Sequence, residues 1–335
     1  MKTKLCKAIC ISLLMGAFLL YGGTSGLAQE KIKAPHMAFS LGSAAGGWTA
    51  IGTVIADNVN KKNFVGFPIT PIPGAGGVGN PKRVSLGDSA VRLAFSYAPF
   101  LKCAVAGKPP YDKPYSNLKA VCGLITNVYH FIVAKKIDIS THAEIKEQKL
   151  PLKLGTGASG STELFTTQAL FKAMGVSLGD LKKWGGKVEQ GSTSARSNLW
   201  KDRHINAWCS FINPPASAVA QVLAARPGKF VPVDKHLRDA LVKQWGYVDI
   251  ALPPGTYTGQ DKPVPAVGLS IVVFARDDVS DEVIYRFTKT VAEMKDKLVK
   301  AYPTFDKWEP EGMCKGLGID IHHGALKYYK ERGWM

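Results

Sequence analysis

The sequence has few of the residues that build metal centres, and none in the spacings that such centres use. It contains six cysteines and seven histidines among 335 residues, with no Cys-x-x-Cys pair and no His-Glu-x-x-His motif. His322 and His323 are adjacent, so their side chains would diverge on a helix. We therefore expect no metal ion, and no nucleotide or other cofactor.

The chain also lacks the arrangement that a serine hydrolase needs. The segment Gly157-Ala158-Ser159-Gly160-Ser161 is similar to the nucleophile elbow Gly-x-Ser-x-Gly, but a serine stands where the last glycine is required. No histidine or aspartate is tied by the sequence to Ser159 as a base or an orienting group. We therefore expect a protein that is not an enzyme.

Acidic residues are scarce, since the chain has 26 Asp and Glu against 43 Lys and Arg, for a formal net charge of +17. The basic residues are scattered singly, and aromatic residues do not alternate with them as in nucleic-acid-binding stretches. We therefore expect no nucleic-acid partner. The excess charge indicates either a solvated basic surface or a field that favours anionic ligands.

No apolar run reaches the ~20 residues that cross a bilayer comfortably. Residues 8–20 are apolar apart from Ser12, and they stand between a basic start and the small residues Gly26-Leu27-Ala28. This pattern predicts a secretory signal peptide, residues 1–28, cleaved near Ala28; a retained anchor is the alternative. Cleavage would remove three lysines and lower the charge from +17 to +14. We expect a periplasmic protein whose mature chain is a monomer and does not insert into the membrane.

Four cysteines follow the predicted cleavage point, and the sequence leaves their state open. Cys122 and Cys209 stand in apolar, strand-like runs, which is typical of buried thiols. A disulfide between Cys103 and Cys122 is the alternative in an oxidising compartment.

The chain contains two units in which a buried strand, a glycine- and hydroxyl-rich loop and a helix follow one another. In the first, the loop is residues 42–47; in the second, it is residues 155–162, followed by a helix over residues 163–174 and a glycine suited to a left-handed C-terminal cap. Helix N-termini carry unpaired N–H groups and partial positive charge, so these loops could cradle an anion. We expect them to face each other across a cleft, although such loops often only make a tight connection.

Strands alternate with helices throughout, which predicts an α/β protein with mainly parallel strands in two lobes. We expect a first lobe over residues 29–128, a second over 129–273, and a return to the first lobe over 274–335. The chain would cross between the lobes near residues 128–134 and 267–275. Asn80 is expected to cap a short helix that begins at Pro81, residues 178–188 to be irregular, and residues 281–301 to form one long helix.

The candidate pocket residues follow from the loops and strand ends. In the first lobe they are Ser43, Gly47, Trp48, Thr49, Gly77, Asn80, Ser96 and Tyr97. In the second lobe they are Thr156, Gly157, Ser159, Gly160, Ser161, Thr162, Ser210 and Asn213. Each hydroxyl has helix capping as its alternative role, and Trp48 has core packing. Two further candidates are Arg196, as a carboxylate clamp or a solvated helix residue, and Tyr257, at the pocket rim or in hinge packing.

Several motifs, in order along the chain, carry a family resemblance. They include Gly76-Gly77-Val78-Gly79-Asn80, the loop of residues 155–162, and Pro254-Gly255-Thr256-Tyr257-Thr258-Gly259-Gln260-Asp261. With them, the chain resembles the TAXI subfamily of solute-binding proteins of tripartite ATP-independent periplasmic (TRAP) transporters. The run Pro73-Gly74-Ala75-Gly76-Gly77 also resembles TctC-like tricarboxylate-transporter binding proteins.

This resemblance implies a two-lobed, type II periplasmic-binding-protein fold with the ligand cleft between the lobes. It implies a small organic anion or amino acid as ligand, such as glutamate or a dicarboxylate, and an ion-driven membrane permease as partner. A periplasmic sensor that docks on a membrane receptor would keep the same cleft. The chain departs from the family at pocket positions: Trp48-Thr49 stands where tyrosines are usual, and Gly79 where glutamate is frequent.

Overall fold

The structure, a computed structural model, describes residues 36–44, 46–62, 68–86 and 90–335. The predicted signal peptide, residues 1–28, lies outside the described residues. The strands are β1 (Met37–Ser40), β2 (Ile69–Ile72), β3 (Val91–Tyr97), β4 (Leu118–Ala134), β5 (Lys153–Thr156), β6 (Lys187–Gln190), β7 (Ala207–Ile212), β8 (Gly228–Phe230), β9 (Val248–Leu252) and β10 (Val264–Arg276).

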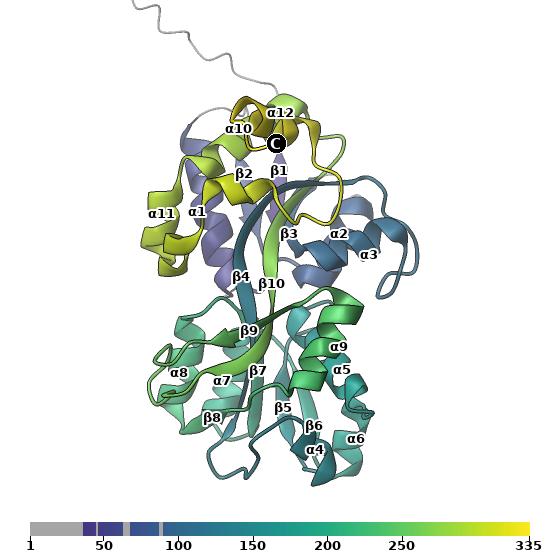
Figure 1. The fold of residues 1–335 in the computed structure, drawn as a ribbon, viewed down its shortest axis with the longest axis vertical. Coiled ribbons are helices and arrows are strands. Elements are labelled where there is room, and N and C mark those ends of the chain that lie inside the picture. The colour runs from purple at the N-terminus through teal and green to yellow at the C-terminus, as the bar shows by residue number, and fades with distance from the viewer. Residues whose placement is uncertain (1–35, 45, 63–67, 87–89) are drawn as a thin grey trace, which may run out of the picture. The chain divides into compact units, whose positions relative to one another are not determined.

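The strands pair in the order β2-β1-β3-β10-β4-β7-β5-β6, with β8 added to β4 and β9 added to β10 (Figure 1). The pairs β1–β2, β1–β3, β5–β6 and β5–β7 are parallel, as the alternating pattern predicts. The pairs that involve β4 or β10 are antiparallel. We call the part with β1, β2 and β3 the first lobe and the part with β5, β6 and β7 the second lobe.

Two long strands belong to both lobes. The end of β10, from Ile271 to Ala275, pairs with β3, while its beginning, from Val264 to Gly268, pairs with β9. In the same way, β4 pairs with β10 along its first part and with β7 from Val128 onward. Both strands can be followed through the two lobes in Figure 1. The chain therefore passes between the lobes within continuous β-strands.

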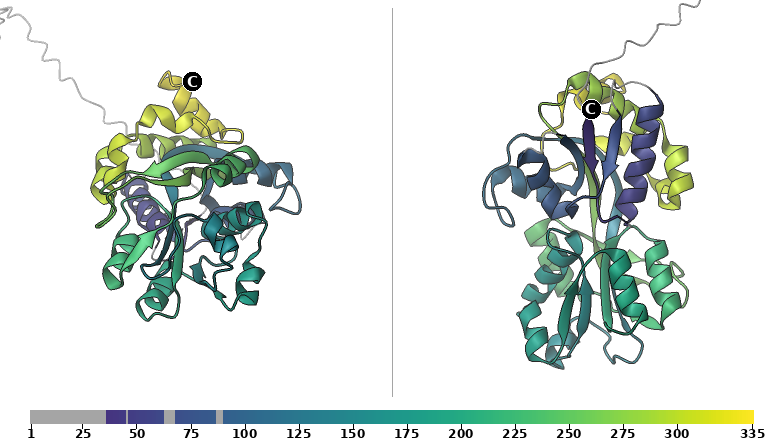
Figure 2. Two further views of the ribbon diagram at one scale, coloured as in Figure 1. Left: turned by 60° about the horizontal axis from the view of Figure 1, so that its bottom comes forward. Right: turned by 180° about the vertical axis from the view of Figure 1, so that it is seen from behind.

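The helices cover the sheet of each lobe (Figures 1 and 2). The first lobe carries α1 (Gly47–Lys61), α2 (Gly76–Leu86), α3 (Ala98–Ala106), α10 (Asp281–Ala292), α11 (Lys295–Ala301) and α12 (His323–Glu331), with two 3₁₀ turns, η1 (Pro303–Lys307) and η2 (Pro310–Cys314). The second carries α4 (Ala143–Glu147), α5 (Thr162–Ala173), α6 (Leu178–Lys183), α7 (Thr193–Lys201), α8 (Ser217–Ala225) and α9 (Lys235–Trp245).

Local sequence explains where the main helices start. The hydroxyls of Ser161, Ser192 and Ser280 each accept a hydrogen bond from a backbone N–H in the first turn of α5, α7 and α10. Such caps satisfy donors that the helix itself leaves unpaired. Gly175, with φ of 73°, follows α5 in the left-handed conformation that the sequence predicts there.

Several predicted elements differ from the structure. The apolar runs at residues 118–125 and 128–134 are one strand, β4, because Thr126 and Asn127 continue the extended backbone. Residues 178–188 are not irregular: a capping box at Ser177 and Asp180 starts α6, and β6 follows. The long helix predicted over residues 281–301 is interrupted near Met294 and forms α10 and α11.

The helix predicted to begin at Pro81 begins five residues earlier, at Gly76, and Asn80 is not its cap. Proline has no N–H, so Pro81 cannot donate to the carbonyl of Gly77 four residues before it. The buried Ser96 hydroxyl donates to that carbonyl instead, at 2.6 Å. A side chain from β3 thus supplies the hydrogen bond that proline removes, which allows a proline inside this helix.

The four cysteines of the described residues are free thiols, so the Cys103–Cys122 disulfide does not form in this structure. Cys122 and Cys209 are buried, as expected of thiols in strands of the core. None of the described helices combines the length and the apolar character needed to cross a membrane.

Candidate ligand-binding cleft

A cavity of ≈ 280 Å³ lies between the two lobes, and both predicted glycine-rich loops line it. Four helices begin at its wall: α1 at Gly47, α2 at Gly76, α5 at Thr162 and α7 at Thr193. Each presents first-turn N–H groups without partners inside the helix, together with the positive end of the helix dipole. Some of these N–H groups are already bonded, such as those of Val78 and Gly79 to the carbonyl of Gly160. The positive ends of four helices, from both lobes, and their remaining N–H groups therefore meet at the cavity wall.

The first loop and α1 form one wall. Ser43, Gly47 and Trp48 line the cavity. Trp48 is also core, since its ring contacts Phe95 and Tyr97 with centroids 5.5 and 5.1 Å away. Thr49 lies outside the lining, because its hydroxyl donates to the carbonyl of Ser43 at 2.8 Å and holds the loop in shape.

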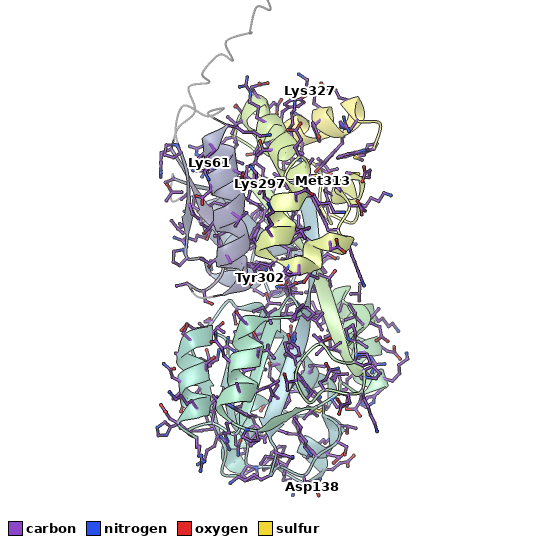
Figure 3. The ribbon with its side chains drawn as sticks, turned by 90° about the vertical axis from the view of Figure 1, so that its left-hand side faces the viewer. Lys61, Asp138, Lys297, Tyr302, Met313 and Lys327 are labelled. Atoms are coloured by element: carbon purple, nitrogen blue, oxygen red, sulfur yellow. The ribbon has the colours of Figure 1, made fainter. Side chains whose placement is uncertain are left out.

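The C-terminal segment reaches this wall. Figure 3 shows Tyr302, which follows α11, on the side of the first lobe that faces the second. A Cβ at Gly47 would lie 2.8 Å from the Tyr302 hydroxyl, so glycine lets this tyrosine approach the start of α1. The neighbouring Thr304 hydroxyl donates to the carbonyl of Pro214 in the second lobe at 2.8 Å.

Of the candidates at α2 and β3, Gly77 and Tyr97 line the cavity, whereas Asn80 and Ser96 do not. The Asn80 amide is fully buried and joins backbone segments: its Nδ2 donates to the carbonyls of Leu41 and Phe95, both at 2.8 Å. Its oxygen accepts from the N–H of Ala75 at 2.9 Å. These two side chains therefore do not line the cavity but hold the loops that line it.

In the second lobe, Gly157, Ser159, Ser161 and Thr162 line the cavity. Ser161 also accepts the capping bond from Leu164 N–H at 3.2 Å, so the alternative of helix capping holds for it. Thr156 is fully buried below the loop and outside the lining. Gly160 is outside it too, because it contacts the backbone of the first lobe.

Arg196 lines the cavity and is 1% exposed, so the alternative of a solvated helix residue is wrong. Its guanidinium donates to the carbonyls of Gly191 (3.1 Å) and Cys209, and forms an ion pair with Glu163 at 3.3 Å. Most of its donors are thus used within the second lobe, which fixes the charge at the cavity wall. Burial, followed by the charge of Glu163, raises the pKa of the nearby Tyr97, which keeps that hydroxyl protonated.

The polar lining residues that sequence reasoning missed include Glu163, Asn127 and the segment Gly191-Ser192-Thr193. Glu163 was assigned only to the first turn of a helix, although an acidic residue there is close to the preceding loop. Asn127 stands between two apolar runs, at the polar break where β4 passes the cleft. The segment before α7 repeats the glycine- and hydroxyl-rich pattern in a shorter form. Ser210 and Asn213, which were predicted, line the cavity at the end of β7.

Tyr257 lies outside the lining, as the hinge-packing alternative requires. Its hydroxyl is 2.9 Å from Nε2 of His130 and accepts from the N–H of Ala216 at 3.1 Å. Nδ1 of His130 lies 2.9 Å from the carbonyl of Val128 and must donate to it, so Nε2 is the acceptor of the Tyr257 proton. Burial lowers the pKa of His130 to about 4, which keeps it neutral in this cluster.

Two lobes joined by shared strands, with a cavity between them, form the fold of periplasmic binding proteins, and comparisons with solved structures agree. BugD, a periplasmic binding protein, is 14% identical over 89% of this chain and 97% of its own, with a TM-score of 0.56. MatC from Rhodopseudomonas palustris, solved with bound malate, is 15% identical over 89% and 97%, with a TM-score of 0.54. The R. palustris protein Rpa4515, solved with adipate, is 13% identical over 89% and 95%, with a TM-score of 0.50.

Residues 39–333 match the NMT1-like family, and the chain belongs to that family. The predicted two-lobed α/β fold is thereby confirmed.

Proposed function

We propose that this protein is an extracytoplasmic solute-binding protein that captures a small organic anion or amino acid and delivers it to a TRAP-type permease. The observation that carries the proposal is the convergence of four helix N-termini, from both lobes, on one cavity. Backbone donors fixed in this way suit a carboxylate without a metal ion. A protein with this role needs no catalytic group, and we propose none.

The charges of the lining narrow the ligand. Among the described lining residues, the charged side chains are Arg196 and Glu163, and they pair with each other. The lining side chains therefore have no net charge, and the helix termini alone would have to balance a multiply charged ligand. This balance favours a monocarboxylate or an amino acid over a tricarboxylate, and so favours the TRAP-type role over a TctC-like one.

A thermal-shift screen of the protein purified from periplasm tests the proposal. Monocarboxylates, dicarboxylates, tricarboxylates and amino acids would be compared with neutral sugars. A true ligand raises the melting temperature by mass action, with ~2.7 kcal/mol of added stability at a hundred times its Kd. Shifts by sugars alone, or binding that a chelator abolishes, would contradict the proposal.

Export, partner and lobe bounds belong to the same proposal. Mass spectrometry of the periplasmic protein should give a chain that begins near Gln29. In this proposal the first lobe comprises residues 29–128 and 274–335, and the second comprises residues 129–273. A permease should retain the liganded protein more strongly than the ligand-free one. Retention by a receptor kinase instead would favour the alternative of a periplasmic sensor.

A further inference from the structure

The floor of the cavity carries two buried amide oxygens that no described group satisfies. They are Oδ1 of Asn127, in β4, and Oδ1 of Asn213, directly after β7. Both side chains line the cavity and are 2% exposed. A buried acceptor without a partner lowers stability by roughly 1–3 kcal/mol, so a group that supplies the missing donors would gain affinity here.

The orientation of each amide is fixed by its other contacts. Nδ2 of Asn127 lies 3.3 Å from the carbonyl of Phe211 and 2.8 Å from the Tyr97 hydroxyl. Nδ2 of Asn213 lies 2.8 Å from the carbonyl of Thr126. A carbonyl only accepts hydrogen bonds, so the nitrogen must face it in both residues, and flipping either amide would set two oxygens against each other. The oxygens are therefore the atoms left without partners.

The two amides lie next to each other at the end of the β4–β7 ladder. The outermost pair of this ladder is Val128 opposite Ile212, and Asn127 and Asn213 are the next residues on the two segments. Nδ2 of each amide bonds to a carbonyl of the opposite segment, Asn127 to Phe211 and Asn213 to Thr126. Because both residues line the same cavity, one small ligand can meet both oxygens.

We propose that Asn127 and Asn213 select a ligand that carries a hydrogen-bond donor, a hydroxyl or an ammonium group, in addition to its carboxylate. This inference rests on the proposed function, in which helix N-termini hold the carboxylate. The N–H groups at the helix starts would bind the carboxylate of the ligand, and the two amide oxygens would accept from its hydroxyl or ammonium group. The carboxylate of Glu163, on the same lining, adds a further acceptor.

Titration calorimetry on two matched series tests this selection. One series is propionate, lactate and alanine; the other is succinate, malate and aspartate. In at least one series, the hydroxyl- or amino-bearing members should bind at least tenfold more tightly than the parent acid. Lactate against alanine, and malate against aspartate, show which of the two donors is preferred.

The variants Asn127→Ala and Asn213→Ala should each reduce that preference to within threefold, whatever their absolute affinity. Ser270→Ala is the matched control, because Ser270 is exposed on β10, bonds to Thr126 at 2.9 Å and lies outside the lining. It should keep the full preference. Equal affinity within both series, with the acids still bound, would overturn the selection but leave the proposed function intact. Failure of every acid to bind would contradict both the selection and the proposed function.

Discussion

Gly160 of the second lobe lies against Ala75 of the first, so closely that a Cβ at position 160 would be 2.9 Å from the Ala75 carbonyl oxygen. The carbonyl of Gly160 in turn accepts hydrogen bonds from the N–H groups of Val78 (3.2 Å) and Gly79 (3.1 Å) at the start of α2. The loop that the sequence assigned to ligand contact thus also joins the two lobes.

Replacing Gly160 with alanine should weaken ligand binding by tenfold or more, about 1.4 kcal/mol, because the new methyl group would hold the lobes apart. The φ of 81° at this position adds strain to any side chain, so a control is needed. Gly255→Ala provides it, with φ of 73° and nothing within 4 Å of a Cβ. Calorimetry and melting curves should show lost stability in both variants but weaker binding only in Gly160→Ala. Equal affinities would show that lobe contact at Gly160 is unimportant.

The Arg196–Glu163 pair should contribute to the stability of the second lobe. In Arg196→Met, the Cys209 carbonyl would lose its charged donor, and Glu163 would remain beside the cavity without its cation. Removing one partner of a buried ion pair typically lowers stability by ~3–5 kcal/mol; because Glu163 is 17% exposed, we expect about 3. Urea unfolding would measure it.

A double variant separates pairing from packing at this site. Arg196→Met combined with Glu163→Gln should be more stable than the sum of the single changes predicts, because no carboxylate is left unpaired. Strict additivity would contradict a direct interaction between the two side chains.

Stability should fall as the solution is acidified from pH 6.5 to 4. Burial lowers the pKa of both His130 and His142 to about 4, from an ordinary value near 6.5. The unfolded chain therefore binds more protons in this window, and stability is complete above pH 6.5 and is lost as the pH falls to about 4. Each histidine contributes up to about 3 kcal/mol to this loss of stability.

His142→Asn should remove one of these two contributions. Asparagine can still donate to the carbonyl of Pro232, which Nδ1 of His142 meets at 2.9 Å, but it does not titrate. The exposed His236→Asn is the control and should keep the original slope of stability against pH. Urea midpoints between pH 4 and 7 decide; the same slope in all three proteins would refute the assignment.

The rate at which each thiol is alkylated should follow its burial. At about pH 9, iodoacetamide should label Cys103, which is partly exposed, faster than Cys122, Cys209 and Cys314, which are buried. In urea, all four should react, and a reducing agent should not change the melting temperature. A drop in melting temperature on reduction would instead support a disulfide between Cys103 and Cys122.

The sequence predicted the fold because hydrophobic periodicity and helix caps are local signals. The strand–loop–helix unit at residues 153–175 has the expected form, with Ser161 as the cap of α5 and Gly175 at its end. Asn127 illustrates the opposite case. Its role depends on β7 lying beside β4, a pairing of residues 84 positions apart that periodicity does not contain.

The difference between lining the cavity and supporting it was also beyond the sequence. Ser43 in the first loop and Thr49 in the first turn of α1 both carry hydroxyls, yet only Ser43 lines the cavity, because the Thr49 hydroxyl donates back to the Ser43 carbonyl. Such a choice depends on side-chain direction, which follows from the final backbone and not from residue type.

Ser96 and Pro81 provide the sharpest test of this supporting role. In Ser96→Ala, the buried carbonyl of Gly77 loses the 2.6 Å bond from the hydroxyl, and Pro81 has no N–H to replace it. We expect a loss of about 1–3 kcal/mol, the usual effect of an unsatisfied buried acceptor. Pro81→Ala restores an N–H four residues after Gly77, so Ser96→Ala should be less destabilising in that background. Urea unfolding of the four proteins in this cycle gives the coupling energy. A coupling near zero would mean that Ser96 does not replace the hydrogen bond that Pro81 removes.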